Sequence, residues 1–364
     1  MSEGFIPQMC PLFGSEERDA VAAYMDSGGF VTEFKKTEEF EDAIASFTGA
    51  KHCVVVNNGT ISLTLAALAL DIGPGDEVIV PNYTMIATPN SLKLIGAVPV
   101  FVDVNPNTLI LDLNLVRQAI TSETKGICLV LANGRYPSDG IEQFEELAEE
   151  FGLTLIEDAA QSLGSRYPDG RHIGRAGKIG SFSFSAPKII STGQGGALIT
   201  DDDDISNKLR RLKDFGRASG GNDLHDSIGF NFKFTDLQAC VGLEQMKKLE
   251  NRITRKKEIW SIYNELLEPQ ENVTLFDHSI EYTAPWFIDC LVKDREGLIS
   301  FLKGKGVGSR AMYPPIHAQN CYGQDGSFPV SENIGEKGLW LPSYSHLLDS
   351  EIESVCASIA AFYK

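Results

Sequence analysis

Short apolar runs alternate with helical patterns between about residues 50 and 201. The runs are strand-like and lie at residues 53–57, 77–81, 98–104, 127–132 and 153–159. Helical stretches such as 61–70 and 141–151 lie between them. Continuous apolar strands that alternate with helices are typical of a parallel sheet covered on both faces. The chain is therefore predicted to be an α/β protein with a large, mostly parallel sheet.

Two further strand-like runs follow closely, at residues 179–185 and 195–201. The gap leaves no room for a crossover helix, so part of the sheet is expected to be antiparallel. A long helical region is predicted at 235–267, where the apolar stripe drifts around the axis, as in a helix that passes from one domain to the next. The last 90 or so residues predict a strand at 287–292 and helices near 296–303 and 351–363, which indicates a small α/β domain.

The composition argues against several classes of protein. The formal net charge is −18, and a nucleic-acid partner would need clustered lysine and arginine. The chain has no run of about 18 apolar residues, so no membrane span is expected. The first residues lack a basic stretch followed by an apolar one, so no secretory signal is expected and a cytoplasmic location is predicted.

The seven cysteines are scattered and contain no C-x-x-C pair. Cys53 and Cys128 lie inside strand-like runs. This pattern favours reduced core cysteines in a cytosolic protein over a disulfide framework, and no metal site is predicted.

One lysine stands out by its place in the sequence. Lys188 follows the run 179–185, and Gly193, Gly195 and Gly196 come soon after it. Most lysines are solvated surface groups. At the end of a buried strand beside a glycine-rich turn, however, the amine can be partly desolvated, which lowers its pKa and makes it a usable nucleophile and base. Lys188 is therefore the first candidate catalytic residue.

Two acids, Glu157 and Asp158, end the predicted strand at 153–159. Successive side chains of a strand point to opposite faces, so only one of the two can face a given pocket. The carboxyl end of a parallel strand is where α/β proteins bind ligands. A carboxylate there can hold a pyridinium nitrogen protonated, ligate a metal or cap a helix, and the residues alone leave these three alternatives open.

A third candidate segment is the junction of a strand and a helix at residues 56–60. Gly59 allows close approach of the backbone, and Thr60 can cap the helix. Free amides at a helix N-terminus form an anion site, although a plain N-cap is the alternative. The chain contains no G-x-G-x-x-G after a strand, which argues against a nucleotide-dependent oxidoreductase.

These three segments, in this order and spacing, resemble the DegT/DnrJ/StrS family of sugar aminotransferases. The resemblance covers nearly the whole chain and includes residues 72–81, 96–103, 157–162, 181–196 and 229–239. It implies the aspartate-aminotransferase fold, which is fold type I of the pyridoxal-phosphate (PLP) enzymes. A seven-stranded sheet domain is expected at 1–245 and a small C-terminal α/β domain at 246–364, and segment 1–35 is expected to contribute to the active site.

The resemblance also implies roles for individual residues. Lys188 is expected to hold PLP as a Schiff base and to move the proton, and Asp158 is expected to contact the pyridine nitrogen. Gln161 is expected near the ring hydroxyl, and Asn231 at the phosphate of the neighbouring subunit's cofactor, which implies a homodimer with shared active sites. The expected phosphate-binding positions within the chain are Gly59, Thr60 and Ser183.

Some positions depart from the family pattern on the substrate side. Met85 stands where the family usually has an aromatic that stacks on the cofactor ring, and Lys233 stands where arginine is usual. Residues 131–134 differ from the usual His-Leu-Tyr-Gly. The segment 306–317 resembles the one that faces the substrate, and its candidate substrate-binding residues are Arg310, Tyr313 and His317.

The implied reaction is a PLP-dependent transamination with L-glutamate as the amino donor. The implied acceptor is a nucleotide-linked 4-keto-6-deoxy sugar, and the product is a 4-amino-4,6-dideoxy sugar for O-antigen, lipopolysaccharide or another glycan. Residues 189–196 most resemble the perosamine-synthase branch, which aminates C4 of a GDP-linked sugar. The alternatives are a sugar 3-dehydratase, which carries histidine in place of Lys188, a C3-aminotransferase, and a non-catalytic regulator.

Overall fold

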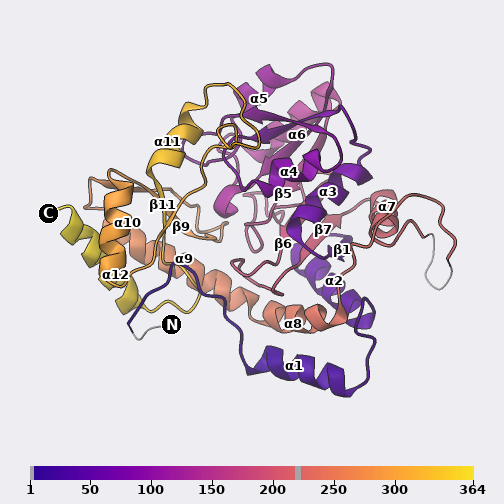
Figure 1. The fold of residues 1–364 in the computed structure, drawn as a ribbon, viewed down its shortest axis with the longest axis horizontal. Helices are drawn as coiled ribbons and strands as arrows, with labels where there is room; N and C mark the ends of the chain where they lie inside the picture. Colours follow the sequence, from indigo (N-terminus) through magenta and orange to yellow (C-terminus); the bar gives the residue numbers. More distant parts are fainter. Residues whose placement is uncertain (1–3, 218–222) are drawn as a thin grey trace.

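A seven-stranded sheet forms the centre of the larger part of the structure (Figure 1). The computed structural model describes residues 4–217 and 223–364. The strands stand in the order β1-β7-β6-β5-β4-β2-β3. They are β1 His52–Val56, β2 Glu77–Pro81, β3 Val98–Val102, β4 Thr124–Val130, β5 Thr154–Asp158, β6 Ile179–Ser183 and β7 Gly196–Thr200. Only β7 is antiparallel to its neighbours β6 and β1. The prediction of a mostly parallel sheet with an antiparallel part is therefore confirmed.

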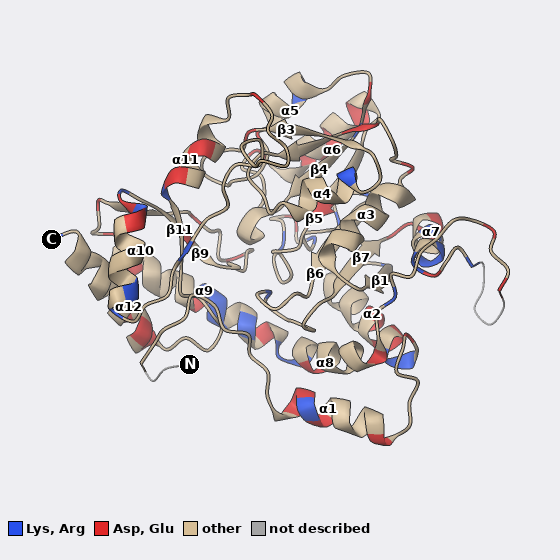
Figure 2. Cartoon of the chain, viewed as in Figure 1, with Lys and Arg blue, Asp and Glu red and all other residues tan. Residues whose placement is uncertain are grey.

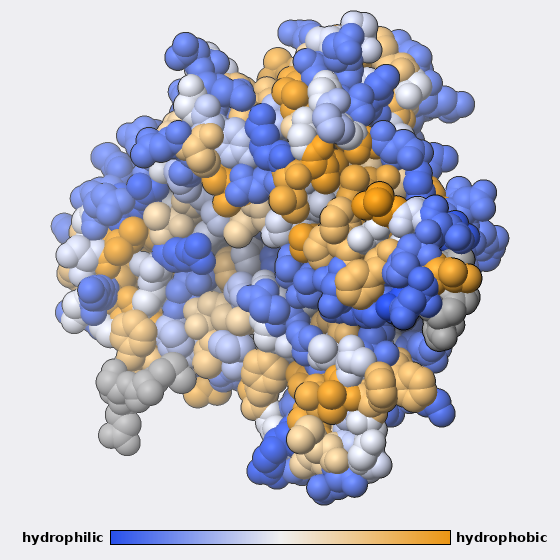
Figure 3. Space-filling view, turned by 45° about the vertical axis from the view of Figure 1, so that its right-hand side comes forward, coloured by the Kyte–Doolittle hydropathy of each residue, from blue (hydrophilic) through white to orange (hydrophobic). Residues whose placement is uncertain are grey.

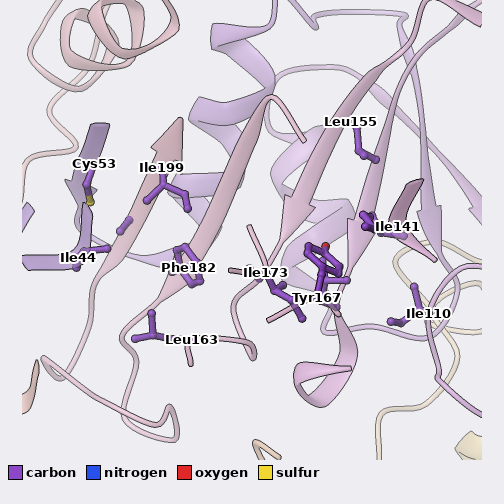
Figure 4. Packing of buried hydrophobic residues seen from close by; sticks show 14 of the residues in the cluster. Ile44, Cys53, Ile110, Ile141, Leu155, Leu163, Tyr167, Ile173, Phe182 and Ile199 are labelled. Atoms are coloured by element: carbon purple, nitrogen blue, oxygen red, sulfur yellow. The ribbon is translucent and has the colours of Figure 1, made fainter. Parts of the chain in front are cut away.

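Helices cover both faces of this sheet, as predicted. One face carries α2 Lys35–Thr48, α5 Leu113–Ala119, α6 Ile141–Phe151 and α8 Asp236–Lys247, and the other carries α3 Gly59–Ala69, α4 Ala87–Lys93 and α7 Asp203–Lys213. The alternation within β1 shows why: Val55 packs in one apolar cluster, and Val54 and Val56 pack in the other. Figure 4 shows part of the first cluster, to which Phe182, Ile199 and Ile44 belong.

The remaining elements of the larger part are α1 Ser15–Asp26, which lies beside α8 in Figure 1, and the short helix η1 Ala132–Gly134. The second part has a four-stranded antiparallel sheet in the order β10-β11-β9-β8. Its strands and helices are β8 Val273–Leu275, β9 Ile288–Val292, β10 Arg310–Ala311, β11 Gly338–Leu341, α10 Arg295–Gly304, α11 Pro329–Lys337 and α12 Asp349–Phe362. It has an apolar cluster of its own. Ile6 near the N-terminus joins that cluster and pairs with Val307.

The predicted long helical region is divided into two helices. The break falls at Lys248, between α8 and α9 Leu249–Leu267, so the predicted helical region is confirmed and consists of two successive helices. The bridging role holds for α9 alone: Ile253 packs in a cluster of the large sheet, and Ile259 and Tyr263 pack in the cluster of the small one. Lys and Arg residues, blue in Figure 2, follow one another along α9. The boundary at residue 245 stays a prediction.

All seven cysteines are free thiols, and Cys53 and Cys128 are buried as expected. Among the residues that the structure describes, no helix combines the length and apolarity that crossing a bilayer requires.

Candidate active site

One cavity brings together most of the predicted site residues. It has a volume of about 350 Å³ and lies at the carboxyl ends of the central strands. Seven of the predicted residues line it: Gly59, Thr60, Met85, Asp158, Gln161, Ser183 and Lys188. They come from segments up to 129 residues apart (188 − 59), so the sheet order is what assembles them.

Lys188 lies in the turn that follows β6. Its backbone N–H donates to the carbonyl of Ser185 at 3.0 Å. Its Nζ lies 4.3 Å from the centre of the Trp286 ring, and the indole Nε1–H of Trp286 donates to the carbonyl of Pro187 at 2.8 Å. Burial lowers the pKa of Lys188 to about 8, against the opposing effect of the Asp158 charge. The amine is therefore far closer to neutral at physiological pH than a surface lysine is.

Asp158 faces this cavity and is held in place on both carboxylate oxygens. Thr88 Oγ1 donates to Oδ2 at 2.7 Å, and the backbone N–H of Ala160 donates to Oδ1 at 3.2 Å. Burial raises the pKa of Asp158, while these hydrogen bonds and the charge of Lys188 act in the opposite direction. A carboxylate in this setting gains from a cationic partner in the cavity.

Glu157 points to the other face of the sheet, as strand alternation requires. It is fully buried and accepts hydrogen bonds from the Tyr167 hydroxyl at 2.5 Å and from the backbone N–H groups of Gly174 and Gly177, both at 2.7 Å. Its role is therefore to hold the segment around residues 167–177. Among the described residues, no three His, Cys, Asp or Glu side chains are placed to share a metal ion, which leaves the metal alternative for this pair without support.

The N-terminus of α3 forms another wall of the cavity. Asn58 caps the helix, because its side chain accepts the N–H of Ile61 at 2.9 Å; the prediction that Thr60 is the cap was wrong. Gly59 touches β6 so closely that a Cβ there would lie 2.8 Å from Ser183 Cβ. The first amides of α3 and the Ser183 hydroxyl thus surround one corner of the cavity, which suits a phosphate.

Two further predicted residues line the cavity from other sides. Gln161 Oε1 accepts the backbone N–H of Asn133 at 2.6 Å, which ties the segment after β5 to η1. Met85 is 45% exposed, and its Sδ accepts the N–H of Ala87 at 3.0 Å. The thioether of Met85 can pack on the face of a ring bound in this cavity.

The structure places two predicted substrate residues outside the wall of this cavity. Tyr313 packs edge-on against Trp340 with 4.7 Å between ring centres, and burial raises its pKa to about 12. The guanidinium of the exposed Arg310 lies 5.5 Å from the ring centre of Trp340. Both therefore belong to the edge of the small sheet, and their roles toward a substrate stay predictions.

His317 is engaged within the protein. Its backbone N–H donates to Asn82 Oδ1 at 2.9 Å, and its ring Nδ1 lies 2.9 Å from Asn82 Nδ2. It thereby fixes the segment after β2 to the segment before α11. Asn231 forms an isolated bridge with Asp214 near the end of α7, outside the cavity. Its predicted role concerns a neighbouring subunit and stays a prediction.

Sequence reasoning missed two residues that matter for the geometry. Thr88 holds Asp158, and Gln194 lines the cavity from the turn before β7. A signal for Thr88 exists in principle, because it follows β2 and the carboxyl ends of parallel strands meet at one edge of a sheet. The contact itself depends on the strand order, which the sequence pattern does not contain.

Comparison with known proteins agrees with this geometry. The family model described as "DegT/DnrJ/EryC1/StrS aminotransferase family" matches residues 11–360. The GDP-perosamine synthase of Escherichia coli O157:H7 is 34% identical over 99% of both chains. The structure of DesV of S. venezuelae in complex with a ketimine intermediate matches with a TM-score of 0.91 and 31% identity, over 96% of this chain and 95% of that one. DesI, solved in the presence of its TDP-sugar product, matches with a TM-score of 0.90 and 29% identity over 99% and 93%.

Fold, cavity and matches together define a PLP-type aminotransferase of the α/β class, as the sequence predicted. The chain belongs to the DegT/DnrJ/EryC1/StrS aminotransferase family.

Proposed function

We propose that the chain binds PLP in the cavity around Lys188 and transfers the amino group of L-glutamate to a nucleotide-linked 4-keto-6-deoxy sugar. One observation carries the proposal. A lysine amine with a lowered pKa, a buried carboxylate and the N-terminus of α3 meet in one cavity of about 350 Å³. This volume suits a single small cofactor with part of a substrate.

The residues of the cavity fit PLP group by group. The amides at the start of α3 and the hydroxyl of Ser183 offer donors to the phosphate. Asp158 offers a carboxylate to the pyridine nitrogen, and Lys188 offers the amine that attaches the aldehyde carbon. When bound, PLP supplies an electron sink that stabilises negative charge on the carbon next to the transferred nitrogen.

The side chains then have separate tasks. Lys188 takes a proton from the α-carbon of the amino donor. It returns a proton to the carbon on the other side of the transferred nitrogen. A pKa of about 8 suits a group that both accepts and donates a proton. Asp158 keeps the pyridine nitrogen protonated and is itself held by Thr88. Trp286 holds the backbone at Pro187 and so fixes the direction from which Lys188 acts.

The finer details of the acceptor rest on the relatives. The name of the E. coli relative supports a GDP-linked sugar, whereas the DesI title names a TDP-sugar. Amination at C4 rests on the resemblance of residues 189–196 to the perosamine-synthase branch. We favour the GDP-linked 4-keto-6-deoxy sugar, with a perosamine-type product used in surface polysaccharide or another glycan. Lys188 in the cavity favours amination over C3 deoxygenation, for which histidine is expected at this position.

A homodimer with shared active sites is part of the proposal. Large apolar side chains are exposed on this single chain, among them Phe30, Val31, Ile228 and Phe230. Figure 3 shows apolar side chains grouped among hydrophilic ones on one face. Exposed apolar groups of this kind mark association surfaces. We expect Asn231 of one subunit to reach the phosphate corner of the other.

The proposal is tested by spectroscopy and by substrate choice. Purified protein with PLP should be yellow, and borohydride should bleach it and attach the cofactor to Lys188. Lys188→Ala should abolish both results, and Lys178→Ala, an exposed lysine outside the cavity, should change neither. Transamination by Lys188→Ala would overturn the mechanism. A panel of GDP-, UDP- and dTDP-linked keto sugars with L-glutamate then identifies the acceptor.

A further inference from the structure

A second, much smaller cavity adjoins Lys188. Lys188 contributes to both. The second cavity has a volume of about 20 Å³, which holds one water-sized occupant and no sugar or nucleotide. Its wall is built from five distant segments: residues 9–12, 187–189, α9, 286–287 and 343–345.

Two buried cations of α9 line this cavity. Arg252 and Lys256 are one helical turn apart, so they share a face of the helix. Arg252 is 6% exposed and Lys256 is 5% exposed. Both Nη atoms of Arg252 are engaged: Nη1 donates to the carbonyl of Ile189 at 2.8 Å, and Nη2 donates to the carbonyl of Leu12 at 3.0 Å. Lys256 Nζ donates to the carbonyl of Ser343.

Hydrogen-bonding capacity remains unused around the cavity. Within residues 4–217 and 223–364, Arg252 Nε and Ser343 Oγ are buried without a partner. The Lys256 ammonium has three hydrogens, of which the carbonyl of Ser343 takes one. Arg252 Nε and Lys256 Nζ can only donate, the Ser343 hydroxyl can donate as well as accept, and a buried donor without an acceptor costs about 1–3 kcal/mol.

The lining of this cavity also supplies no counter-charge to Arg252 and Lys256. None of the residues that line the cavity is an acid. Burial alone lowers the pKa of Lys256 to about 7, and burial lowers the pKa of Arg252 despite the more distant charge of Glu17. The other titratable side chains that line the cavity are Lys188, Tyr344 and Cys10, and His278 and His346 lie close enough to interact electrostatically with Lys256 and Arg252, respectively.

We propose that this cavity binds one small monovalent anion of the chloride class, held by Lys256, Arg252 Nε and Ser343 Oγ beside the turn that carries Lys188. A chloride ion accepts several hydrogen bonds and neutralises charge. A water molecule in the same place would accept at most two hydrogen bonds and would leave the charge uncompensated. A metal cation is excluded by the two cations already there.

The anion extends the contacts of α9 with three segments, at Leu12, Ile189 and Ser343. Arg252 donates to the carbonyl of Leu12 and to the carbonyl of Ile189, which directly follows Lys188. By holding Arg252, the anion stabilises residues 9–12 and the turn that carries Lys188. Binding favours the protonated form of Lys256, so affinity falls as pH rises above about 7. This site is separate from the proposed function and does not depend on PLP.

The test uses the whole protein loaded with PLP. Its unfolding midpoint is measured in rising sodium chloride, with sodium gluconate holding the ionic strength constant. We expect a shift that saturates with chloride concentration and becomes smaller between pH 7 and pH 9. Lys256→Met should lose the saturable shift, Ser343→Ala should need several-fold more chloride, and Lys247→Met, an exposed lysine on α8, should behave as wild type. A wild-type midpoint that does not respond to chloride overturns the proposal.

A crystallographic measurement keeps the proposal testable if Lys256→Met does not fold. Crystals of the wild-type protein are soaked in sodium bromide, and anomalous scattering is recorded at the bromine edge. We expect a peak between Lys256 Nζ and Arg252 Nε. An ordered water there, with no anomalous signal, overturns the proposal, whatever the outcome for catalysis.

Discussion

The contact between Gly59 and Ser183 gives a sharp test of the phosphate corner. In a Gly59→Ala variant the new Cβ would lie 2.8 Å from Ser183 Cβ and 3.0 Å from Ser183 Oγ. Rotation of the Ser183 side chain can relieve the contact with Oγ but not the one with Cβ, because the backbone of β6, in the middle of the sheet, fixes Cβ. The start of α3 must therefore move away from the strand.

The size of the effect follows from this geometry. Overpacking by one methyl group in a well-packed region costs about 1–3 kcal/mol. We expect the free energy of unfolding to fall by about that amount. The same displacement moves the amides of Gly59 and Thr60 relative to the phosphate of PLP. If the whole cost falls on binding, the dissociation constant for PLP rises about 5- to 150-fold, since each 1.4 kcal/mol is a factor of ten.

Two assays and one double variant check the reasoning. Urea denaturation reports stability, and titration of the cofactor-free protein with PLP, followed by absorbance, reports affinity. Gly73→Ala is the control, because a Cβ there meets no atom within 4 Å. Adding Ser183→Gly to Gly59→Ala removes the opposing Cβ and should recover part of the loss, beyond the effect of Ser183→Gly alone. A Gly59→Ala variant with wild-type stability and affinity would refute the reasoning.

Three other predictions concern the same cavity. Asp158→Asn should lower kcat about 100-fold, because the pyridine nitrogen loses its anionic partner; steady-state kinetics with a retained yellow colour checks this, and unchanged kcat contradicts it. Trp286→Phe keeps a ring beside Lys188 but removes the donor to Pro187, so urea denaturation should show a loss of about 1 kcal/mol or more; equal stability of the two forms would disprove it. Because the pKa of Lys188 is lowered from 10.5 to about 8, the unfolded chain binds more protons between these values. The stability of the cofactor-free protein should therefore rise with pH across this window relative to Lys188→Met, and a pH-independent difference between the two proteins would contradict the lowered pKa.

Several parts of the fold were open to prediction because the local pattern carries them. Strand β2 occupies residues 77–81 and helix α6 occupies residues 141–151, which are the bounds that the apolar runs and the flanking glycines predict. The antiparallel strand β7 followed from a gap too short for a crossover. Such features depend on residues close together in the chain, so the sequence is sufficient for them.

Other features depended on contacts that the pattern does not contain. The apolar positions of α8 and α9 continue across Lys248, so nothing in their spacing marks the break. Asn58 and Thr60 are both good caps, and only the structure shows that α3 begins at Gly59 and is capped by the side chain of Asn58. The resemblance suggested His317 for the substrate, whereas its hydrogen bonds to Asn82 engage it within the protein.

The sequence by itself determined the chemistry available to this protein: a lysine after a buried strand, an acid at the end of another, and a glycine at the start of a helix. Strand alternation also determined that Glu157 and Asp158 point to opposite faces. Only the tertiary structure decided that Asp158 is the one in the cavity, because the side that faces the ligand depends on the strand order. It alone revealed the cationic cavity beside Lys188, whose wall joins residues 9–12 to 343–345. Arg252 and Lys256 share a face of α9 through their spacing alone, but Ser343, Leu12 and Ile189 reach that face only in the folded chain, so local patterns cannot contain the whole site.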